Sequence, residues 1–141
     1  MLAKISIEIL ELEQNNYHLL VPSVFENGEE GKWVIDTGAS KSVFDQNLEG
    51  YYQTLDGLPD ELHSAGFHDE PITSSSAVLK TFSLGKFRIE GMKVALIDLS
   101  HINSLYSKST RIKICGLLGS DFLLEYKAEI DYRGKRLVLR K

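Results

Sequence analysis

Apolar and polar residues alternate along much of this chain with the two-residue period that is typical of half-buried β-strands. Near the amino terminus, Ile5, Ile7 and Ile9 fall on one face of such a strand. The alternation returns in residues 79–99, where glycines separate short strands, and we expect the strand after Gly91 to be central. The pattern predicts a mainly β fold.

A reversal of the chain is predicted just before the first aspartate. The Asn27-Gly28 pair favours the positive φ angles of a tight turn, and it lies between two runs of β-forming residues. We therefore expect residues 17–25 to pair with residues 32–35 as a β-hairpin. Asp36 follows directly, so its carboxylate is predicted to stand at the end of a strand.

Outside these segments the sequence signals for secondary structure are weaker. Residues 41–69 contain scattered glycines and a proline, which predict a loop with at most a turn of helix, and residues 101–112 are typical of a polar connection. A short helix capped by Ser120 or Asp121 is the only helix that we predict. Residues 128–140 alternate again around an Arg-Gly-Lys turn and are expected to close the chain as strands.

The composition is that of an ordinary folded domain. The chain has 141 residues, of which 43% are hydrophobic and 26% are charged, and this length predicts one domain over residues 1–141. The formal net charge is −4, which provides no basic surface of the kind that nucleic acids require. No apolar run approaches the roughly 20 residues of a membrane helix. We expect neither nucleic acid nor membrane as a partner.

Cys115 is the only cysteine, so the chain cannot form an internal disulfide. A free thiol suits a reducing compartment, and glutamates interrupt the first apolar stretch in a way that signal peptides do not show, so we expect a cytoplasmic protein. The apolar neighbours of Cys115 favour a packing residue over a nucleophile. His63 and His68 lie five residues apart, which is not the spacing of a helical zinc pair, and no metal site is predicted.

The stretch VIDTGAS, from Val34 to Ser40, combines residues that have a chemical use together. Two apolar residues lead to Asp36, Thr37 offers a short hydroxyl to brace a neighbour, and Gly38 lets the backbone turn tightly and approach the carboxylate. The alternative interpretation is a plain strand-terminating turn, because Asp and Gly are common turn residues. For the tripeptide alone, that alternative is favoured.

A second motif favours a chemical role for Asp36 over a plain turn. Residues 117–123, LLGSDFL, place two apolar residues, a glycine and a polar pair before the predicted helix, about 80 residues after Asp36. Together with VIDTGAS, this ordered pair resembles the two signature elements of the retropepsin-type aspartic peptidases, a single-domain family that includes retroviral proteases and bacterial relatives. Residues 128–139 also resemble the closing strands of bacterial members. The resemblance covers most of the chain except about residues 41–76.

The resemblance implies a closed, mainly antiparallel retropepsin-like β-barrel with one short C-terminal helix, active as a homodimeric aspartic endopeptidase. Each subunit would contribute one Asp36, and the two carboxylates would share a proton and activate a water that attacks the peptide bond. Asp36, Thr37 and Gly38 are the implied catalytic residues, with Thr37 bridging to the other subunit. No metal or organic cofactor is implied. The terminal segments 4–10 and 136–140 are expected to pair between subunits, as edge strands readily do.

Substrate is expected to bind as an extended peptide strand. The resemblance implies that Ala39 and Ser40 line the groove, and that a hairpin flap within residues 63–78 contacts substrate through Gly66 and Phe67. The sequence departs from the retroviral pattern, because this flap is polar with a single glycine, and Ser40 stands where many retroviral members have an aspartate. Ala39 also lacks the hydroxyl that other members place beside the carboxylate, which suits activity near neutral pH.

Two other functions are compatible with these residues. The first is a dimer of the same fold that binds peptides or a partner protein with little or no cleavage, since a fold does not guarantee a function. The second treats Asp36 as a phosphoryl acceptor, but such a site needs a second aspartate nearby, and residues 37–42 offer only Lys41. The intact Asp-Thr-Gly-Ala sequence favours the peptidase.

Overall fold

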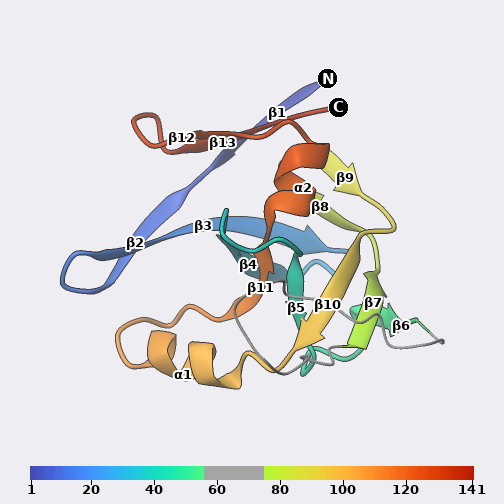
Figure 1. Ribbon diagram of the computed structural model, residues 1–141, viewed down its shortest axis with the longest axis horizontal. Coiled ribbons are helices and arrows are strands. Elements are labelled where there is room, and N and C mark those ends of the chain that lie inside the picture. The colour runs from blue at the N-terminus through green and yellow to red at the C-terminus, as the bar shows by residue number, and fades with distance from the viewer. Residues whose placement is uncertain (56–74) are drawn as a thin grey trace.

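The computed structural model describes residues 1–55 and 75–141, and within them the chain is mainly β, as predicted (Figure 1). The strands are β1 (Leu2–Ser6), β2 (Glu8–Glu13), β3 (Asn16–Phe25), β4 (Glu30–Ile35), β5 (Val43–Asp45), β6 (Tyr52–Thr54), β7 (Ser75–Leu79), β8 (Phe82–Leu84), β9 (Phe87–Ile89), β10 (Lys93–Ile97), β11 (Ile114–Leu118), β12 (Glu129–Asp131) and β13 (Arg136–Arg140). The helices are α1 (Ser100–Ser107) and α2 (Ser120–Glu125).

The strands form two sheets. The larger one follows the order β6-β7-β10-β5-β11-β4-β3-β8-β9, with β2 beside β3, and the smaller one, the terminal sheet, has the order β1-β13-β12. β10 pairs with β5 and β11 with β4 in parallel, so the larger sheet is mixed rather than antiparallel throughout. Parallel pairs form where a long crossover joins the partner strands. Among the described residues, the end strands β6 and β9 do not pair with each other, so the sheet is a curled half-barrel.

The predicted hairpin before Asp36 is confirmed. β3 pairs antiparallel with β4, and Leu20 lies opposite Val34. In the connecting turn, Gly28 has a φ of 87°, a left-handed angle that costs glycine little. β4 ends at Ile35, so Asp36 stands at the end of a strand.

Two strands, β5 and β6, form in the segment where a loop was expected. β5 consists of Val43, Phe44 and Asp45, and all three residues are buried. A strand this short, buried on both faces, shows no alternation, so the sequence carries no periodic signal for it. It forms because β10 and β11 pair with it from its two sides. β10 also pairs with β7, which confirms the central strand predicted after Gly91.

α1 corrects a further expectation, because residues 101–112 were predicted to be a polar connection. The helix Ser100–Ser107 has one buried side chain, Tyr106. Asn103 attaches it to β11, since its Nδ2 donates to the Ile114 carbonyl at 3.1 Å and its Oδ1 accepts the Ile114 N–H at 2.6 Å. Tertiary contacts of this kind hold a short polar helix that would not be stable alone.

α2 lies in the segment where a short helix was expected, but the predicted cap is wrong. The N-cap residue is Gly119, and no side chain caps the helix, neither Ser120 nor Asp121. Asp121 instead accepts two hydrogen bonds from Ser42. The prediction failed because a residue distant in sequence competes with the helix terminus for this carboxylate.

Two apolar clusters pack on opposite faces of the strand that leads to Asp36. Trp33 and Ile35 of β4 belong to the larger cluster, where the Trp33 ring stacks on Phe82 with centroids 5.4 Å apart. Val34, which lies between them, belongs to the smaller cluster, together with residues of α1 and β11. Because β4 is buried on both faces, the hydrophobic effect holds its end in one position.

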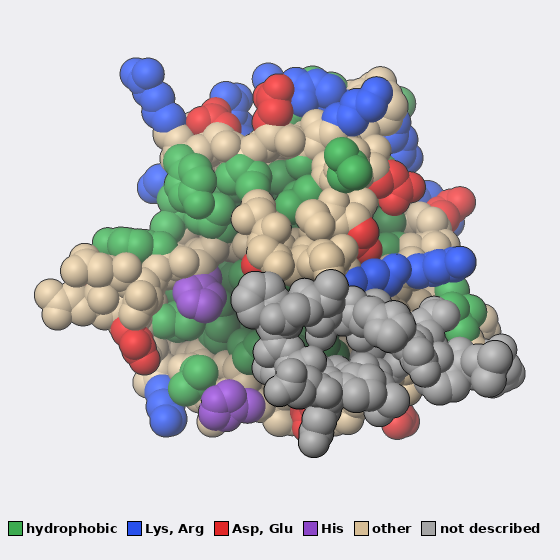
Figure 2. Space-filling view, in the orientation of Figure 1, with side chains coloured by type: hydrophobic (Ala, Val, Ile, Leu, Met, Phe, Trp, Pro, Cys, Tyr) green, Lys and Arg blue, Asp and Glu red, His purple; other side chains and the backbone are tan. Residues whose placement is uncertain are grey.

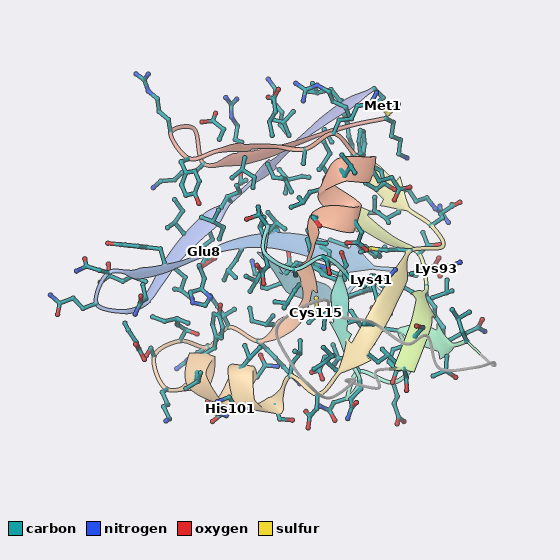
Figure 3. The ribbon with its side chains drawn as sticks, viewed as in Figure 1. Met1, Glu8, Lys41, Lys93, His101 and Cys115 are labelled. Carbon is teal, nitrogen blue, oxygen red and sulfur yellow. The ribbon has the colours of Figure 1, made fainter. Side chains whose placement is uncertain are left out.

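Cys115 lies in β11 inside the molecule (Figure 3) and is 3% exposed. A Cβ placed on Gly31 would lie 2.9 Å from the Cys115 Sγ, so the sulfur packs against the backbone of β4. Burial raises the pKa of the thiol well above its ordinary value. The interpretation of Cys115 as a packing residue is confirmed.

The two ends of the chain lie side by side (Figure 1). β1 pairs antiparallel with β13, with Ala3 opposite Leu139, and β12 pairs with the other edge of β13. Of the segments that were expected to pair between subunits, residues 4–6 pair with residues 136–138 of the same chain, and residues 8–10 pair with β3. Both edges of β13 are occupied, so a partner chain has no access to the backbone of that strand.

Candidate active site

Asp36 is held at the junction of β4 and β11. Its backbone N–H donates to the Leu118 carbonyl at 2.9 Å, which extends the pairing of these two parallel strands to Asp36. The Asp36 side chain is half-buried. Two fixed strands, rather than a free loop, therefore determine where the carboxylate lies.

The chain after Asp36 folds back onto the carboxylate; we call residues 36–40 the Asp-Thr-Gly turn. Gly38 N–H donates to Asp36 Oδ1 at 3.0 Å, and Ala39 N–H donates to the Asp36 carbonyl at 3.1 Å. A Cβ at position 38 would lie 3.3 Å from Asp36 Oδ1, so any side chain there would crowd the oxygen that the backbone approaches. The Gly38 N–H thus orients the carboxylate.

The residues of the Asp-Thr-Gly turn differ in how far they are exposed to solvent. Thr37, Gly38 and Ser40 are exposed, and Ala39 is half-buried. The structure therefore places all five predicted site residues of the first motif, residues 36–40, in one turn at the surface.

The remaining predicted substrate residues cannot be placed in this way. Gly66 and Phe67 lie outside the described residues, as do residues 63–74 of the expected flap. Residues 75–78 form the start of β7, which pairs antiparallel with β6.

The second sequence motif packs directly against the Asp-Thr-Gly turn. Ser120 N–H donates to the Ala39 carbonyl at 2.7 Å. A Cβ on Gly119 would lie 2.7 Å from that carbonyl oxygen and 2.9 Å from the backbone of Lys41, closer than real Cβ atoms come to other atoms. Gly119 is thus required for the close approach of two backbones. The two motifs form one structural unit.

Ser42 fastens this unit, and sequence reasoning did not single it out. It is fully buried, and its Oγ donates to Asp121 Oδ1 at 2.7 Å while it accepts the Gly119 N–H at 2.9 Å. The Ser42 backbone N–H also donates to Asp121 Oδ1, at 2.9 Å. The sequence shows both Ser42 and Asp121, but a single sequence gives no signal that residues 79 positions apart are in contact.

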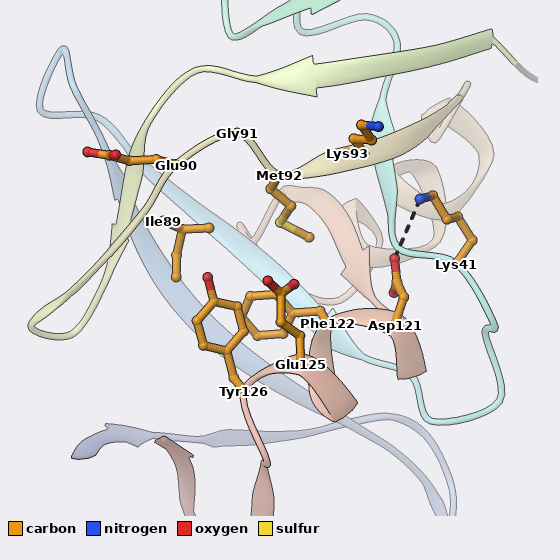
Figure 4. A pocket seen from close by; sticks show the side chains of 10 residues that line it. All are labelled: Lys41, Ile89, Glu90, Gly91, Met92, Lys93, Asp121, Phe122, Glu125 and Tyr126. Atoms are coloured by element: carbon orange, nitrogen blue, oxygen red, sulfur yellow. Dashed lines mark ion pairs between the residues drawn. The ribbon is translucent and has the colours of Figure 1, made fainter. Parts of the chain in front are cut away.

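Lys41 pairs with the other oxygen of the same carboxylate, since its Nζ lies 3.8 Å from Asp121 Oδ2 (Figure 4). The two side chains are 34% and 30% exposed, so solvent screens the pair and it adds little stability. They stand at the rim of a cavity of about 300 Å³ that Met92 and Phe122 also line (Figure 4). Asp36 does not line this cavity.

Asp36 lines a different and larger cavity of about 640 Å³, which we call the Asp36 cavity. Its apolar lining comes from the β2–β3 hairpin, β4, β11 and α1: Leu12, Val34, Ile102, Leu105 and Leu117. Its polar lining, besides Asp36, comes mostly from the hairpin and α1: Glu13, Asn15, Asn16, Tyr17, His18, Tyr106, Lys108 and Ser109. A cavity of this size and lining suits an organic group such as a peptide side chain. Sequence reasoning missed it because α1 was not predicted.

The chemistry available at this site is that of a carboxylate held by a backbone N–H beside a partly apolar cavity, which is acid–base chemistry. Within residues 1–55 and 75–141, no group of three or more His, Cys, Asp or Glu side chains is placed to hold a metal ion. Neither helix in these ranges is long and apolar enough to cross a membrane.

This chain resembles known aspartic proteases in sequence profile and in fold. The sequence profile of the aspartyl protease family matches residues 21–122. A solved retropepsin-like aspartic protease from Rickettsia conorii has a TM-score of 0.51 at 19% identity, covering 99% of this chain and 90% of that one. The retroviral protease-like domain of Ddi1 from Leishmania major has a TM-score of 0.47 at 13% identity, covering 85% of this chain and 90% of that one. No curated protein matches the sequence.

The matched residues run from β3 into α2 and include the first motif and all but the last residue of the second. They make up more than half of the chain, and the similarity to the Rickettsia structure extends over nearly all of it. The chain therefore belongs to the aspartyl protease family and has a retropepsin-like fold.

Proposed function

We propose that this protein is an aspartic endopeptidase that works as a homodimer. The observation that carries the proposal is the position of Asp36, whose carboxylate sits in a turn held by β11 and by the second motif, on the wall of the Asp36 cavity. The family supports the reaction class. Each chain provides a single Asp-Thr-Gly sequence, so two subunits are needed to bring two such carboxylates together.

In the proposed reaction, the two Asp36 carboxyl groups share one proton and hold a water between them. The ionised carboxylate takes a proton from the water, whose oxygen adds to the carbonyl carbon of the peptide, while the protonated partner donates its proton to the carbonyl oxygen. The C–N bond then breaks as one carboxyl group protonates the leaving nitrogen, while the other carboxylate takes a hydroxyl proton from the intermediate as the carbonyl re-forms, so the pair again holds one proton. The Gly38 N–H supports this role because it keeps one carboxylate oxygen oriented.

The surface near the terminal sheet supports the dimer. Figure 2 shows hydrophobic side chains gathered in the area between the terminal sheet and β3. Elements bordering this area carry two highly exposed hydrophobic residues, since Leu124 of α2 is 81% exposed and Tyr132, next to β12, is 66% exposed. A second copy of the chain would cover them. Because both edges of β13 are occupied, we place the partner at the free edge of β1 or β12, with Thr37 facing the other subunit.

Substrate would lie as an extended strand across the Asp-Thr-Gly turn, past Ala39 and Ser40, with backbone hydrogen bonds for affinity and side-chain cavities for selectivity. The Asp36 cavity is one that reaches the carboxylate. Gly66 and Phe67 keep their proposed role as substrate contacts. They belong to the segment that connects β6 with β7, two strands that pair antiparallel.

Peptide-library cleavage read by mass spectrometry tests the proposal. The wild-type protein should cut internal peptide bonds, and Asp36→Asn should lose cleavage, because an amide has nearly the same size but cannot accept the proton of water. The matched control is Glu26→Gln, the same chemical change at an exposed residue in the β3–β4 turn, which should cleave like the wild type.

Two outcomes would contradict the proposal. Cleavage by Asp36→Asn at the wild-type rate would mean that the catalytic group lies elsewhere. A wild-type protein that binds library peptides without cutting them would support a peptide-binding module with the same fold instead.

A further inference from the structure

A histidine and a tyrosine meet on the wall of the Asp36 cavity. His18 lies in β3 and Tyr106 in α1, and the Tyr106 hydroxyl oxygen is 2.7 Å from His18 Nδ1. The two rings meet edge to face, with centroids 5.6 Å apart and planes at 90°. The contact joins the β2–β3 hairpin to α1, so it holds the His18 ring in one orientation beside the cavity.

The burial of Tyr106 determines the direction of this hydrogen bond. Tyr106 is 1% exposed, and burial raises the pKa of its hydroxyl to about 12, so the hydroxyl keeps its proton at neutral pH. A buried O–H needs an acceptor, and His18 Nδ1 is the partner that the described residues offer it. Tyr106 therefore donates, and the neutral His18 ring carries its own proton on Nε2.

The Nε2–H group of His18 is consequently a hydrogen-bond donor with no partner among the residues described here. His18 is half-buried and lines the Asp36 cavity. Much of the surrounding cavity wall is apolar, and its charged residues are Asp36, Glu13 and Lys108, of which Glu13 accepts a hydrogen bond from Asn16 at 3.3 Å. A donor at a partly apolar wall is satisfied when a ligand brings an acceptor to it.

We propose that His18 is a specificity-determining residue, and that the Asp36 cavity selects a substrate side chain with an apolar body and a hydrogen-bond acceptor at its tip, tyrosine over phenylalanine. This inference rests on the proposed peptidase function. The apolar walls accept either ring and discriminate weakly between them, whereas a donor built into the site favours the ring that carries a hydroxyl. Because Asp36 lines the same cavity, the selected residue flanks the bond that is cleaved.

Two peptides that differ only in tyrosine or phenylalanine at the cleaved position test the inference. The wild type should show a kcat/KM about tenfold higher for the tyrosine peptide, the effect of about one hydrogen bond. His18→Leu should reduce this ratio to about one. His18→Gln, whose amide N–H replaces the Nε2–H, should restore part of it. A purely packing role for His18 would lower the rates for both peptides alike and leave the ratio unchanged.

Binding to the Asp36→Asn variant, measured by fluorescence anisotropy, makes the same comparison without turnover. The tyrosine peptide should bind about tenfold more tightly, and His18→Leu in the same background should remove the difference. Equal kcat/KM values for the two peptides in the wild type, or a ratio that survives His18→Leu, would overturn the inference and leave the peptidase in place. If the wild type cleaves neither peptide, the proposed function fails, and the binding ratio alone then decides the role of His18.

Discussion

Ser42 Oγ donates a hydrogen bond of 2.7 Å to Asp121 Oδ1, although 79 positions separate the two residues in the sequence. The same hydroxyl accepts the Gly119 N–H, and the same carboxylate oxygen accepts the Ser42 N–H. Each of these groups has a partner, as a buried polar network requires. The turn that carries Asp36 and the start of α2 therefore behave as one unit, and a change in either displaces the other.

Ser42→Ala is expected to destabilise the protein by about 1–3 kcal/mol, because it leaves the buried Gly119 N–H without an acceptor. Urea denaturation measures this loss, and kcat/KM should fall with it as the Asp-Thr-Gly turn shifts. Ser40→Ala, an exposed serine in the same turn, is the matched control and should change stability by no more than about 0.5 kcal/mol. Equal stabilities of the two variants would show that the Ser42 hydroxyl does not fasten the turn.

Ala39→Ser is expected to shift the pH range of cleavage toward acid. A hydroxyl at this position, in a turn whose backbone already bonds to Asp36, can donate to the ionised carboxylate and stabilise it. The active ionisation state of the pair then persists to lower pH, so the bell-shaped profile of kcat/KM moves in that direction. Dimer content is checked at every pH, because dissociation would imitate a titration. An unmoved or alkaline-shifted profile would place residue 39 out of reach of the carboxylate.

The Cys115 thiol is expected to be unreactive in the folded protein. Burial holds its pKa far above neutral, so at pH 8 the thiol stays protonated as well as inaccessible, and the reactive thiolate does not form. Ellman's reagent should detect no thiol in the native protein at pH 8 and one thiol per chain after denaturation in urea. A full thiol signal from the folded protein would contradict the burial of β11.

Leu124→Glu is expected to dissociate the proposed dimer, because it places a charge on an apolar surface that the partner would cover. Sedimentation at micromolar concentration should show the wild type at twice the 15.9 kDa chain mass and the variant at the mass of one chain. Cleavage should be lost together with the dimer. Val24→Glu, at a 43% exposed residue of β3, is the control and should remain dimeric. A wild-type protein of 15.9 kDa that still cleaves peptides would contradict a carboxylate pair shared between subunits.

Local sequence signals were sufficient where the structure itself is local. The hairpin between β3 and β4 follows from a turn dipeptide and two runs of β-forming residues, which act over a few positions. The turns before β9 and β10 likewise place Gly85 and Gly91 at positive φ, 57° and 66°. Residues 101–112 had no comparable signal, because α1 depends on the contact of Asn103 with Ile114 across a loop.

The residues of the candidate site likewise fall into those that the sequence predicted and those that only the fold brings together. The motif alone pointed to Asp36, because the chemistry of an Asp-Thr-Gly sequence is carried by adjacent residues. The residues that shape the Asp36 cavity come from the β2–β3 hairpin, β4, β11 and α1, and only the fold brings these elements together. Sequence reasoning could not predict them without the helix, which it did not find.

By itself, the sequence determined the mainly β class, the strand that ends at Asp36 and the resemblance to retropepsin-type peptidases, because each is expressed in residues that are close together or in short motifs. The tertiary structure alone decided that Ser42 joins Asp121, that β1 pairs with β13 within one chain, and that His18 and Tyr106 share a cavity with the carboxylate. These contacts join residues far apart in the chain. Many such pairings have similar hydrogen-bonding and burial energies when taken one at a time, and only the packing of all the strands and helices together selects among them.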